Sequence, residues 1–358
     1  MHGPADPAGV NALLGRLCSP EAHGFAWAVT RGGQRLASGW GGSAVSHPER
    51  HPAAGDTLWD LASLTKPLAT ALVALRAAQD GRLDLLEPIP ETDPPCTGLD
   101  LLRHQAGFPP WLPLYAFSSG RAEARTWLAS RCPRRHPSGQ AEYSCLGYLL
   151  LGLHLEERLG ASLDRLFQKF VAEPLGLPAE SALFRPAESV RSKTAATELD
   201  GAHEAALARP HGALPPLFAT GLAWGEVHDG NARFLGGVAG NAGLFASLPA
   251  VERLCDAFRA SAGFLTARSL DLAWTSPHGR GQRRTAGWKA ADSEGWTVAP
   301  LLPAGSVGHE GFTGTAAYLE PGEGRTFILL TNRIHPAHPG TDFAPVRAAF
   351  LRCAGGLA

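Results

Sequence analysis

The sequence lacks a net charge of either sign. Among its 358 residues, 32 are Lys or Arg and 33 are Asp or Glu, which gives a formal net charge of -1 at pH 7. A chain with that balance has no overall electrostatic attraction to nucleic acid or to an anionic lipid surface. We therefore expect neither nucleic acid nor a membrane among its partners.

A long apolar run is also missing. The best candidate, Leu146–Leu155, is interrupted by Gly147, Gly152 and His154 and is shorter than the roughly 18 residues that a membrane span requires. The first residues, Met1–Asp6, lack the basic stretch and the apolar core of a signal peptide. The sequence therefore favours a soluble, cytoplasmic protein, with export left open.

Paired cysteines and metal-binding clusters are absent as well. The six Cys show neither Cys-x-x-Cys pairs nor zinc spacing, as expected for isolated thiols in a reducing compartment. His228 with Asp229, and His335 with His338, could be interpreted as metal ligands, but prolines interrupt the second pair. The Gly-rich segment 236–243 lacks the strand and acidic residue of a dinucleotide-binding fingerprint. We therefore predict neither a metal site nor a dinucleotide-binding site from these patterns.

What the sequence does contain is the patterning of a globular core. Hydrophobic residues are 44% and charged residues 18%, which suits one large domain or two ordinary ones. Turn residues between short apolar runs predict one hairpin over 24–40 and a second over 313–331. Apolar residues at helical spacing predict helices over 67–79, 145–159, 162–172, 249–260, 267–274 and 343–353.

Strands at both ends with helices between them predict an α+β fold. In this arrangement an antiparallel sheet is built from both termini, is flanked by helices, and carries a mainly helical insertion. We assign residues 1–85 and 290–358 to the sheet region and residues 86–289 to the inserted region. The cleft between the two regions is the expected site.

Ser63 and Lys66 lie three residues apart where a predicted helix begins, next to Pro67. In a helical or 3₁₀ turn, two such side chains lie on the same side. A desolvated lysine can be uncharged and accept the serine proton, and a helix N-terminus favours the negative charge that then develops. The spacing alone is equally typical of a serine N-cap followed by a solvated lysine.

Two later segments favour the catalytic interpretation. Tyr143 lies in a loop that leads into an apolar helix, where a phenol can relay a proton; the alternative is a tyrosine that only packs the helix start. Gly311, at the entry to the last hairpin, leaves room for a ligand along the strand edge, and the Phe312 N–H could then be an oxyanion donor beside that of Ser63. The alternative there is a bulged strand without a ligand.

These residues carry a resemblance to a known family. Ser63-x-x-Lys66, Tyr143-Ser144-x and His309-x-Gly311 occur in that order and resemble the motifs of the serine β-lactamase and penicillin-binding protein superfamily. The match is to its class C-like branch, which also holds esterases, D-amino-acid peptidases and muropeptide amidases. Further segments that resemble this branch are 59–67, 102–107, 228–232, 236–245 and 330–336.

The resemblance implies a β-lactamase/transpeptidase-like fold and a role for each motif residue. Ser63 would be the nucleophile, Lys66 its proton acceptor, and Tyr143 the relay of that proton to the leaving group. Backbone N–H groups of Ser63 and Phe312 would hold the oxyanion. No metal or organic cofactor is implied.

The chain departs from the family pattern at two motifs. Cys145 stands where Asn is usual, and His309-Glu310-Gly311 replaces Lys-Thr-Gly or a close variant. A thiol is a poor substitute for an amide, and Glu310, if it faces the cleft, would disfavour an anionic substrate tail. We place Cys145 and His309-Glu310-Gly311 along the substrate and expect that substrate to lack the β-lactam carboxylate. In the Gly-rich loop Asn241 stands in place of His, and we expect this loop to pack against the core and to line the cleft.

The predicted function is a serine hydrolase that forms an acyl-Ser63 intermediate with a small acyl ester, amide or peptide-like substrate. Two alternatives remain: a non-catalytic binding protein of the same fold, and a serine transacylase. Cys145 as the nucleophile is less favoured, because it has neither the adjacent lysine nor the helix end of Ser63. The oligomeric state is not predicted.

Overall fold

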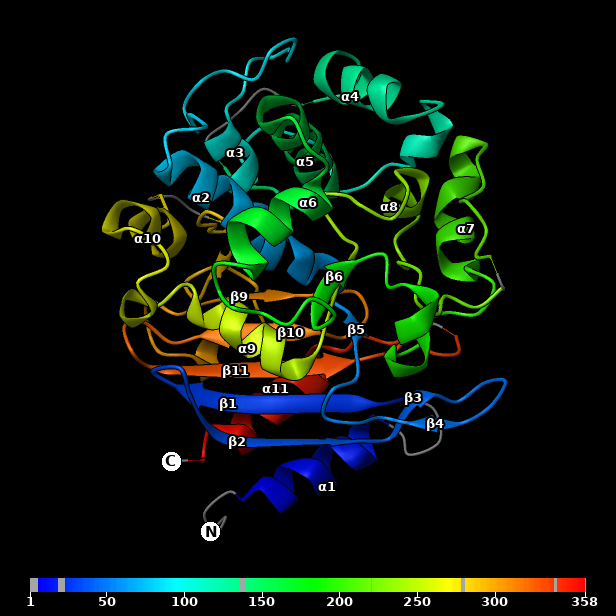
Figure 1. Cartoon of the computed structure of the whole chain (residues 1–358), viewed down its shortest axis with the longest axis vertical. Helices are drawn as coiled ribbons and strands as arrows, with labels where there is room; N and C mark the ends of the chain where they lie inside the picture. The colour runs from blue at the N-terminus through cyan, green and yellow to red at the C-terminus, as the bar shows by residue number, and fades with distance from the viewer. Residues whose placement is uncertain are drawn as a thin grey trace.

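The computed structural model describes residues 6–18, 23–134, 140–219, 221–277, 281–337 and 340–357. Its main feature is a six-stranded antiparallel sheet with the strand order β2-β1-β11-β10-β9-β8. Both ends of the chain contribute to it, as predicted, and Figure 1 shows its strands lying side by side, with most of the helices above them and the helix of residues 7–17 below. The strands are β1 (Phe25–Arg31), β2 (Gln34–Gly41), β8 (Lys289–Ala290), β9 (Val307–Glu310), β10 (Ala316–Leu319) and β11 (Arg325–Thr331).

Both faces of this sheet are covered, and β1 explains how. Its side chains alternate between faces, so Trp27 and Val29 join the core beneath α1 (Pro7–Leu17) and α11 (Ala344–Ala354). Ala26 and Ala28 join the larger core on the opposite face. Small residues on that face let α9 (Leu248–Asp256) pack directly on β1 and β11.

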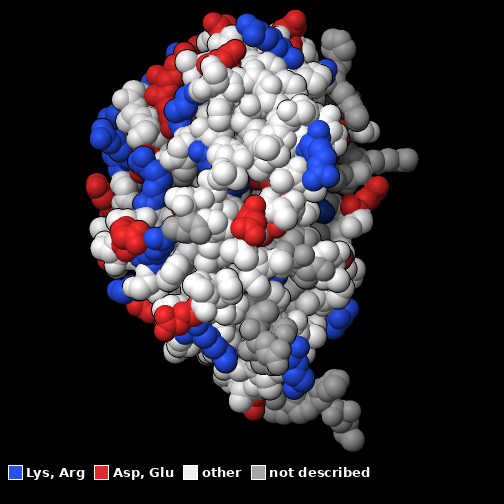
Figure 2. All heavy atoms as spheres, turned by 90° about the vertical axis from the view of Figure 1, so that its right-hand side faces the viewer, with Lys and Arg blue, Asp and Glu red and all other residues white. Residues whose placement is uncertain are grey.

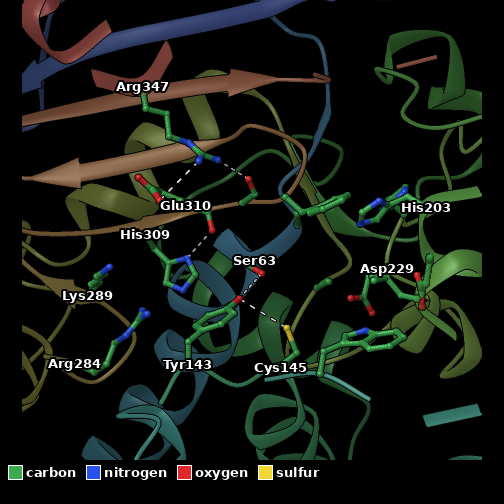
Figure 3. A pocket seen from close by; sticks show the side chains of 18 of the residues that line it. Ser63, Tyr143, Cys145, His203, Asp229, Arg284, Lys289, His309, Glu310 and Arg347 are labelled. Carbon is green, nitrogen blue, oxygen red and sulfur yellow. Dashed lines mark hydrogen bonds and ion pairs between the residues drawn. The ribbon is translucent and has the colours of Figure 1, made fainter. Parts of the chain in front are cut away.

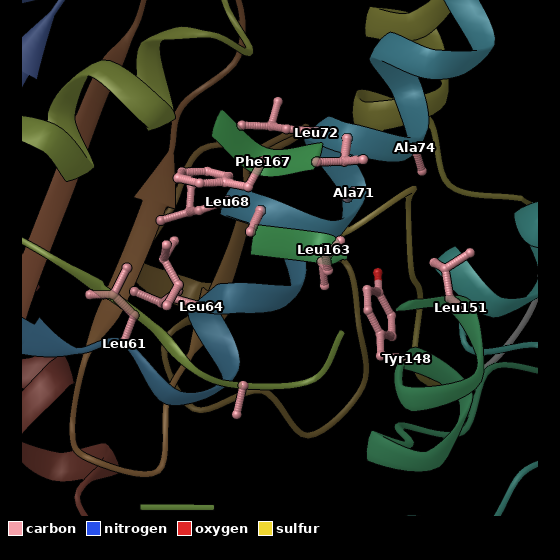
Figure 4. Close-up of a cluster of buried hydrophobic side chains, with 14 of the residues drawn as sticks. Leu61, Leu64, Leu68, Ala71, Leu72, Ala74, Tyr148, Leu151, Leu163 and Phe167 are labelled. Atoms are coloured by element: carbon pink, nitrogen blue, oxygen red, sulfur yellow. The ribbon is translucent and has the colours of Figure 1, made fainter. Parts of the chain in front are cut away.

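The larger core surrounds the segment that runs from Ser63 into α2 (Leu72–Gln79). Leu64, Leu68 and Leu72 are fully buried along it, and Figure 4 shows them packed beside Phe167. The other helices lie between the two hairpins in sequence, and they are α3 (Gly98–Leu102), α4 (Arg121–Ser130), α5 (Cys145–Leu159), α6 (Leu163–Phe167), α7 (Ala202–Ala208), α8 (Gly230–Phe234) and α10 (Ala267–Trp274).

Two small sheets complete the fold. Strand β5 (Trp59–Asp60) pairs with β7 (Leu244–Ala246), which pairs with β6 (Ala182–Phe184). The hairpin of β3 (Ser43–Val45) and β4 (His51–Pro52) lies apart from them. Strand β5 leads directly into the turn that carries Ser63, so this pairing ties that turn to the inserted region.

The predicted α+β class and the antiparallel sheet built from both termini are confirmed. The division into 1–85 with 290–358 and 86–289 stays a prediction, because one core cluster includes residues from both ranges. Strands β6 and β7 lie in segments without a predicted element, and so does α1. Three-residue strands are too short to show a hydrophobic period.

Charges of both signs are interspersed on the face of the molecule drawn in Figure 2. On the face drawn in Figure 2, acidic and basic side chains lie mostly toward the margins, and much of the centre is neither. Within the described residues, no helix is both long and apolar enough to cross a membrane.

Candidate active site

Ser63 lies in a tight turn between β5 and α2. Residues Ala62–Leu64 form a 3₁₀ turn, and a π-helical turn, Lys66–Ala71, leads into α2. Ala62 has a φ of 46°, which costs energy for a residue with a Cβ. The carboxylate of Asp60 holds it there, because Asp60 Oδ1 accepts a hydrogen bond from the Ala62 N–H at 2.9 Å.

The three predicted catalytic side chains meet at one point. Lys66 Nζ donates to Ser63 Oγ at 2.8 Å. Tyr143 Oη lies 2.8 Å from the same oxygen, and Figure 3 shows the Ser63 and Tyr143 side chains facing each other. Lys66 is completely buried. Tyr143 comes from the segment just before α5, so the inserted region supplies it to a turn that follows β5.

Electrostatics keep this group protonated at neutral pH. Burial lowers the pKa of Lys66, but the neighbouring Cys145 and Tyr143 groups outweigh it, and the net direction is upward. Burial raises the pKa of Tyr143, again beyond the opposing effect of Lys66. The upward direction does not support the expected uncharged Lys66 amine at neutral pH, so in the proposed chemistry the pair must lose a proton before it can act as a base.

Cys145 occupies the position expected from the second motif. Its Sγ lies 3.6 Å from Lys66 Nζ and 3.8 Å from Tyr143 Oη. Both contacts have the length of weak sulfur hydrogen bonds, so the thiol fills the space of an amide but orients the lysine only weakly.

The Gly-rich loop provides a stronger hold on Lys66. The carbonyl of Asn241 accepts a hydrogen bond from Lys66 Nζ at 3.0 Å, and Asn241 Nδ2 donates to Asp229 Oδ2 at 3.1 Å. The sequence predicts only packing and cleft lining for this loop. Its backbone also fixes the amine beside Ser63, a function that the side-chain motif does not reveal.

Strand β9 forms another wall of the site, beside Ser63 and Tyr143. His309 is buried, its ring centroid is 5.9 Å from that of Tyr143, and its Nε2 has no hydrogen-bond partner among the described residues. Burial first, and then the charges of Arg284 and Lys66, hold the pKa of His309 well below its usual value. The imidazole is therefore uncharged at neutral pH and can exchange hydrogen bonds with a substrate.

Gly311 follows β9 and touches the serine turn. A Cβ at this position would lie 2.1 Å from Thr315 Oγ1 and 2.7 Å from the carbonyl oxygen of Leu61. Thr315 Oγ1 itself donates to that Leu61 carbonyl at 3.0 Å. The strand end thus abuts the turn of Ser63 directly, and only glycine permits this approach.

Glu310 does not present a free charge to the cavity. Its Oε1 accepts hydrogen bonds from Tyr318 Oη at 2.8 Å and Trp296 Nε1 at 3.2 Å, and its Oε2 lies 3.7 Å from Arg347 Nη1. Figure 3 shows the carboxylate turned toward Arg347. The predicted obstacle to an anionic substrate is thereby neutralised.

Two cations that the sequence analysis does not identify line the same end of the cavity. Arg284 is buried with its guanidinium 5.1 Å from the Tyr143 ring, and Lys289 Nζ lies 5.1 Å from the Trp296 ring. Burial lowers the pKa of Arg284 to about 10 and that of Lys289 to about 8. Among the described residues, neither has a carboxylate within ion-pair distance, and Arg284 Nε has no hydrogen-bond partner.

The other end of the cavity is acidic and apolar. Figure 3 places His203 and Asp229 on the far side of Ser63 from Arg284 and Lys289. The whole cavity measures about 410 Å³. Burial, with Asp229 nearby, raises the pKa of Glu204 to about 7. Phe312 and His228 lie at this end too, because the Phe312 ring packs against the rings of both His203 and His228. The cavity lining also includes Trp111 and Leu207.

Phe312 borders the cavity and is an exposed residue. The ring stacks on His228 with centroids 5.3 Å apart. The Phe312 nitrogen is bonded to the carbonyl carbon of Gly311. That carbonyl accepts hydrogen bonds from Arg347 Nη2 at 2.7 Å and from the Gly314 N–H at 3.1 Å. Phe312 and Ser63 therefore line one cavity, as the predicted oxyanion site requires.

The possible metal ligands do not converge in the described part of the chain. Among the described residues, no group of three or more His, Cys, Asp or Glu side chains is arranged so that it could hold a metal ion. Both ring nitrogens of His335 contact backbone, with the Ser46 N–H on Nε2 and the Thr197 carbonyl at Nδ1. His338 lies outside the described residues.

Comparison with known proteins now places the chain. The family model described as Beta-lactamase matches residues 16–351. The chain belongs to the beta-lactamase family. A relative from Salmonella typhi, named "Putative D-alanyl-D-alanine carboxypeptidase", is 26% identical over 325 residues, which span 82% of this chain and 73% of the relative.

Solved structures show the same fold. "EstCE1, a hydrolase with promiscuous acyltransferase activity" superposes with a TM-score of 0.75 at 20% identity, covering 98% of this chain and 97% of that one. A penicillin-binding protein homolog from Caulobacter crescentus has a TM-score of 0.74 at 20% identity and covers 100% of this chain and 99% of its own. The β-lactamase/transpeptidase-like fold implied by the sequence resemblance is therefore confirmed.

Proposed function

We propose that this member of the beta-lactamase family is a serine hydrolase that cleaves an ester or amide through an acyl-Ser63 intermediate. The observation that carries the proposal is the convergence of Lys66 Nζ and Tyr143 Oη on Ser63 Oγ, each at 2.8 Å. Among the described residues that line the cavity, Ser63 is the only Ser or Thr.

The reaction then follows from the contacts. The deprotonated Lys66–Tyr143 pair takes the proton of Ser63 Oγ, and the oxygen bonds to the substrate carbonyl carbon. The oxyanion is held by the N–H groups of Ser63 and Phe312. Tyr143 delivers the proton to the leaving alcohol or amine as its bond to carbon breaks, and water releases the acyl group by the reverse sequence.

The cations of the cavity favour a carboxylate on the leaving group. Tyr143 is the proposed proton donor to that group, and Arg284 lies against the Tyr143 ring. A carboxylate placed there would meet Arg284 and Lys289, while Glu310 is already paired with Arg347. The match to a relative named for a D-alanyl-D-alanine carboxypeptidase supports this substrate class. We therefore place peptide-like substrates with a carboxylate on the leaving group ahead of neutral esters, which revises the expectation of a substrate that lacks the β-lactam carboxylate.

A substrate screen tests the proposed function. Wild type and Ser63→Ala are assayed on short acyl esters, D-alanyl peptides and muropeptides, and hydrolysis is expected from wild type alone. Equal turnover by both proteins contradicts the proposal. Binding without any Ser63-dependent turnover on the whole panel would favour the non-catalytic alternative.

Acyl transfer is separated from hydrolysis by product analysis. EstCE1, which has the same fold, is a hydrolase with promiscuous acyltransferase activity, and this motivates the comparison. With an added alcohol, a hydrolase yields mainly the free acid. A predominance of the new ester would instead identify a transacylase that uses the same acyl-Ser63.

A further inference from the structure

Arg347 contacts backbone that the proposed chemistry needs. It comes from α11, on the face of the sheet opposite to α9, and is largely buried. Its Nη2 donates to the Gly311 carbonyl at 2.7 Å and to the Thr315 carbonyl at 3.4 Å. Figure 3 shows the guanidinium reaching from α11 toward the end of β9.

The Gly311 carbonyl and the Phe312 N–H belong to one peptide group. In a trans peptide they are coplanar and point in opposite directions, so fixing the carbonyl also fixes the direction of the N–H. The peptide 311–312 is not among the cis peptide bonds of the described residues. Because Arg347 binds the Gly311 carbonyl, the Phe312 N–H of the same peptide group points away from Arg347.

The other half of the oxyanion site is held separately. The carbonyls of Asp60 and Leu61 accept hydrogen bonds from Thr313 Oγ1 at 2.8 Å and Thr315 Oγ1 at 3.0 Å. These bonds tie the serine turn to the loop after β9, but neither of them involves the Gly311 carbonyl. That carbonyl is held by Arg347 and, from within its own loop, by the Gly314 N–H.

We propose that Arg347 is a positioning residue that orients the Phe312 N–H as an oxyanion donor. The inference rests on the proposed acyl-serine function. Since the oxyanion exists only in the tetrahedral state, a misdirected N–H weakens transition-state binding and leaves ground-state binding intact. The predicted signature is a loss in kcat with little change in KM.

The test compares Arg347→Gln, Arg347→Lys and the matched control Arg352→Gln, an exposed arginine on the same helix. The substrate is an ester with an uncharged leaving group, so a direct contact of Arg347 with a substrate carboxylate plays no part. We expect Arg347→Gln to lower kcat by about 10- to 100-fold, below the loss of roughly 10²- to 10³-fold on deleting a donor. Arg347→Lys should recover part of the kcat that Arg347→Gln loses, and the control Arg352→Gln should have the kcat of wild type.

A transition-state analogue gives a second readout. A trifluoromethyl ketone forms a hemiketal oxyanion on a serine, so its inhibition constant should rise in step with the fall in kcat across the variants. A merely structural role would not produce this parallel. If Arg347→Gln does not fold, Arg347→Lys decides through the same two measurements.

Two results would overturn the inference. One is an unchanged kcat and inhibition constant in the folded Arg347 variants. The other is a loss confined to substrates that carry a carboxylate, which would make Arg347 a direct substrate contact. Failure of the proposed function is distinct, since Ser63→Ala would then hydrolyse the neutral ester as fast as wild type.

Discussion

In the proposed mechanism, Lys66 and Tyr143 share the protons beside Ser63 Oγ, and their pKa values would set the pH at which the serine reacts. The pKa of each is raised, so the pair is fully protonated at neutral pH and its basic form grows as pH rises. We expect kcat/KM on a neutral ester to increase with pH above 7 and into the alkaline range. A pH–rate profile measures this, with the unfolding temperature recorded at each pH.

Tyr143→Phe is the matched variant for that profile. It removes the phenol but keeps the ring against His104 and His309. Its rate should be lower, and the alkaline rise should shift because one member of the pair is gone. A wild-type profile that is flat from pH 7 to 10 would contradict the proton-sharing account.

Arg284 is expected to select the leaving group. Arg284→Gln should raise KM by about 10- to 100-fold for an acyl ester of a 2-hydroxy acid, the equivalent of one charge-assisted hydrogen bond. The methyl ester of the same substrate should be nearly unaffected. Above pH 8, KM for the carboxylate form should also rise in wild type, because Lys289, with its pKa lowered to about 8, loses its charge.

Arg283→Gln is the control for this comparison. Its guanidinium pairs with Asp292 at 2.9 Å and does not line the cavity. If Arg284→Gln raised KM equally for the carboxylate substrate and for its methyl ester, the proposed carboxylate contact would be wrong.

The motif residues could be predicted from the sequence because their spacing reflects one local turn. Ser63 and Lys66 are three residues apart, and Tyr143 directly precedes a helix. Arg284, Lys289 and Arg347 could not be found this way. Their positions depend on the pairing of β8 with β9 and on the docking of α11, and no short spacing in the sequence records those contacts.

Helix α5 and the Gly-rich loop together position Lys66. A Cβ on Gly152 would lie 2.8 Å from the Gly240 nitrogen and 2.9 Å from its Cα, both backbone atoms. Gly152→Ala should therefore push the loop outward, move the Asn241 carbonyl away from Lys66, and lower kcat by roughly tenfold. It should also destabilise the fold by about 1–3 kcal/mol, as overpacking does.

Gly15→Ala provides a matched glycine in helix α1. Its Cβ would meet nothing within 4 Å, so helix propensity alone predicts a gain of up to roughly 1 kcal/mol and unchanged activity. Thermal unfolding and kcat are measured for both variants. A Gly152→Ala enzyme with wild-type kcat would show that the loop does not fix the amine.

Elements with a clear period or clear turn residues could be predicted. The helix over 145–159 and the first hairpin agree with α5, β1 and β2. Helix α1 is absent from the predicted elements although Asp6 caps it and Pro7 begins it, a signal that the sequence does carry. Strands β6 and β7 exist through pairing with β5, which local sequence does not show.

At the scale of the whole molecule, a few buried polar side chains join distant segments. Asn332 Oδ1 accepts from the Gly24 N–H, and its Nδ2 donates to the carbonyls of Ala44 and Ala196. His335 joins Ser46 to Thr197 in the same region. The start, middle and end of the chain are thus connected at one point beside the sheet.

His335 should make stability depend on pH. Burial lowers its pKa to about 4, against about 6.5 in an unfolded chain. The unfolded state binds more protons between these values, so the stability from a neutral His335 is present above pH 6.5 and is lost as pH falls toward 4. The free energy of unfolding, measured by urea titration from pH 7 to 4.5, should fall less steeply in His335→Gln than in wild type.

The comparison of slopes separates His335, together with its neighbour His23, from titrating groups elsewhere in the molecule. His154 has its pKa lowered to about 4 as well, and the raised pKa of Glu204 acts in the opposite direction. Both are present in wild type and variant alike. Identical slopes would show that His335 does not report on folding.

The most direct measurement of the central claim is the mass-spectrometric location of a covalent adduct. Wild type is treated with a fluorophosphonate probe or a slowly hydrolysed acyl ester, digested, and compared with Ser63→Ala. The adduct is expected on the peptide that carries Ser63 and should be absent from the variant. An adduct on Cys145 or on any other residue, or turnover that survives in Ser63→Ala, would contradict the account.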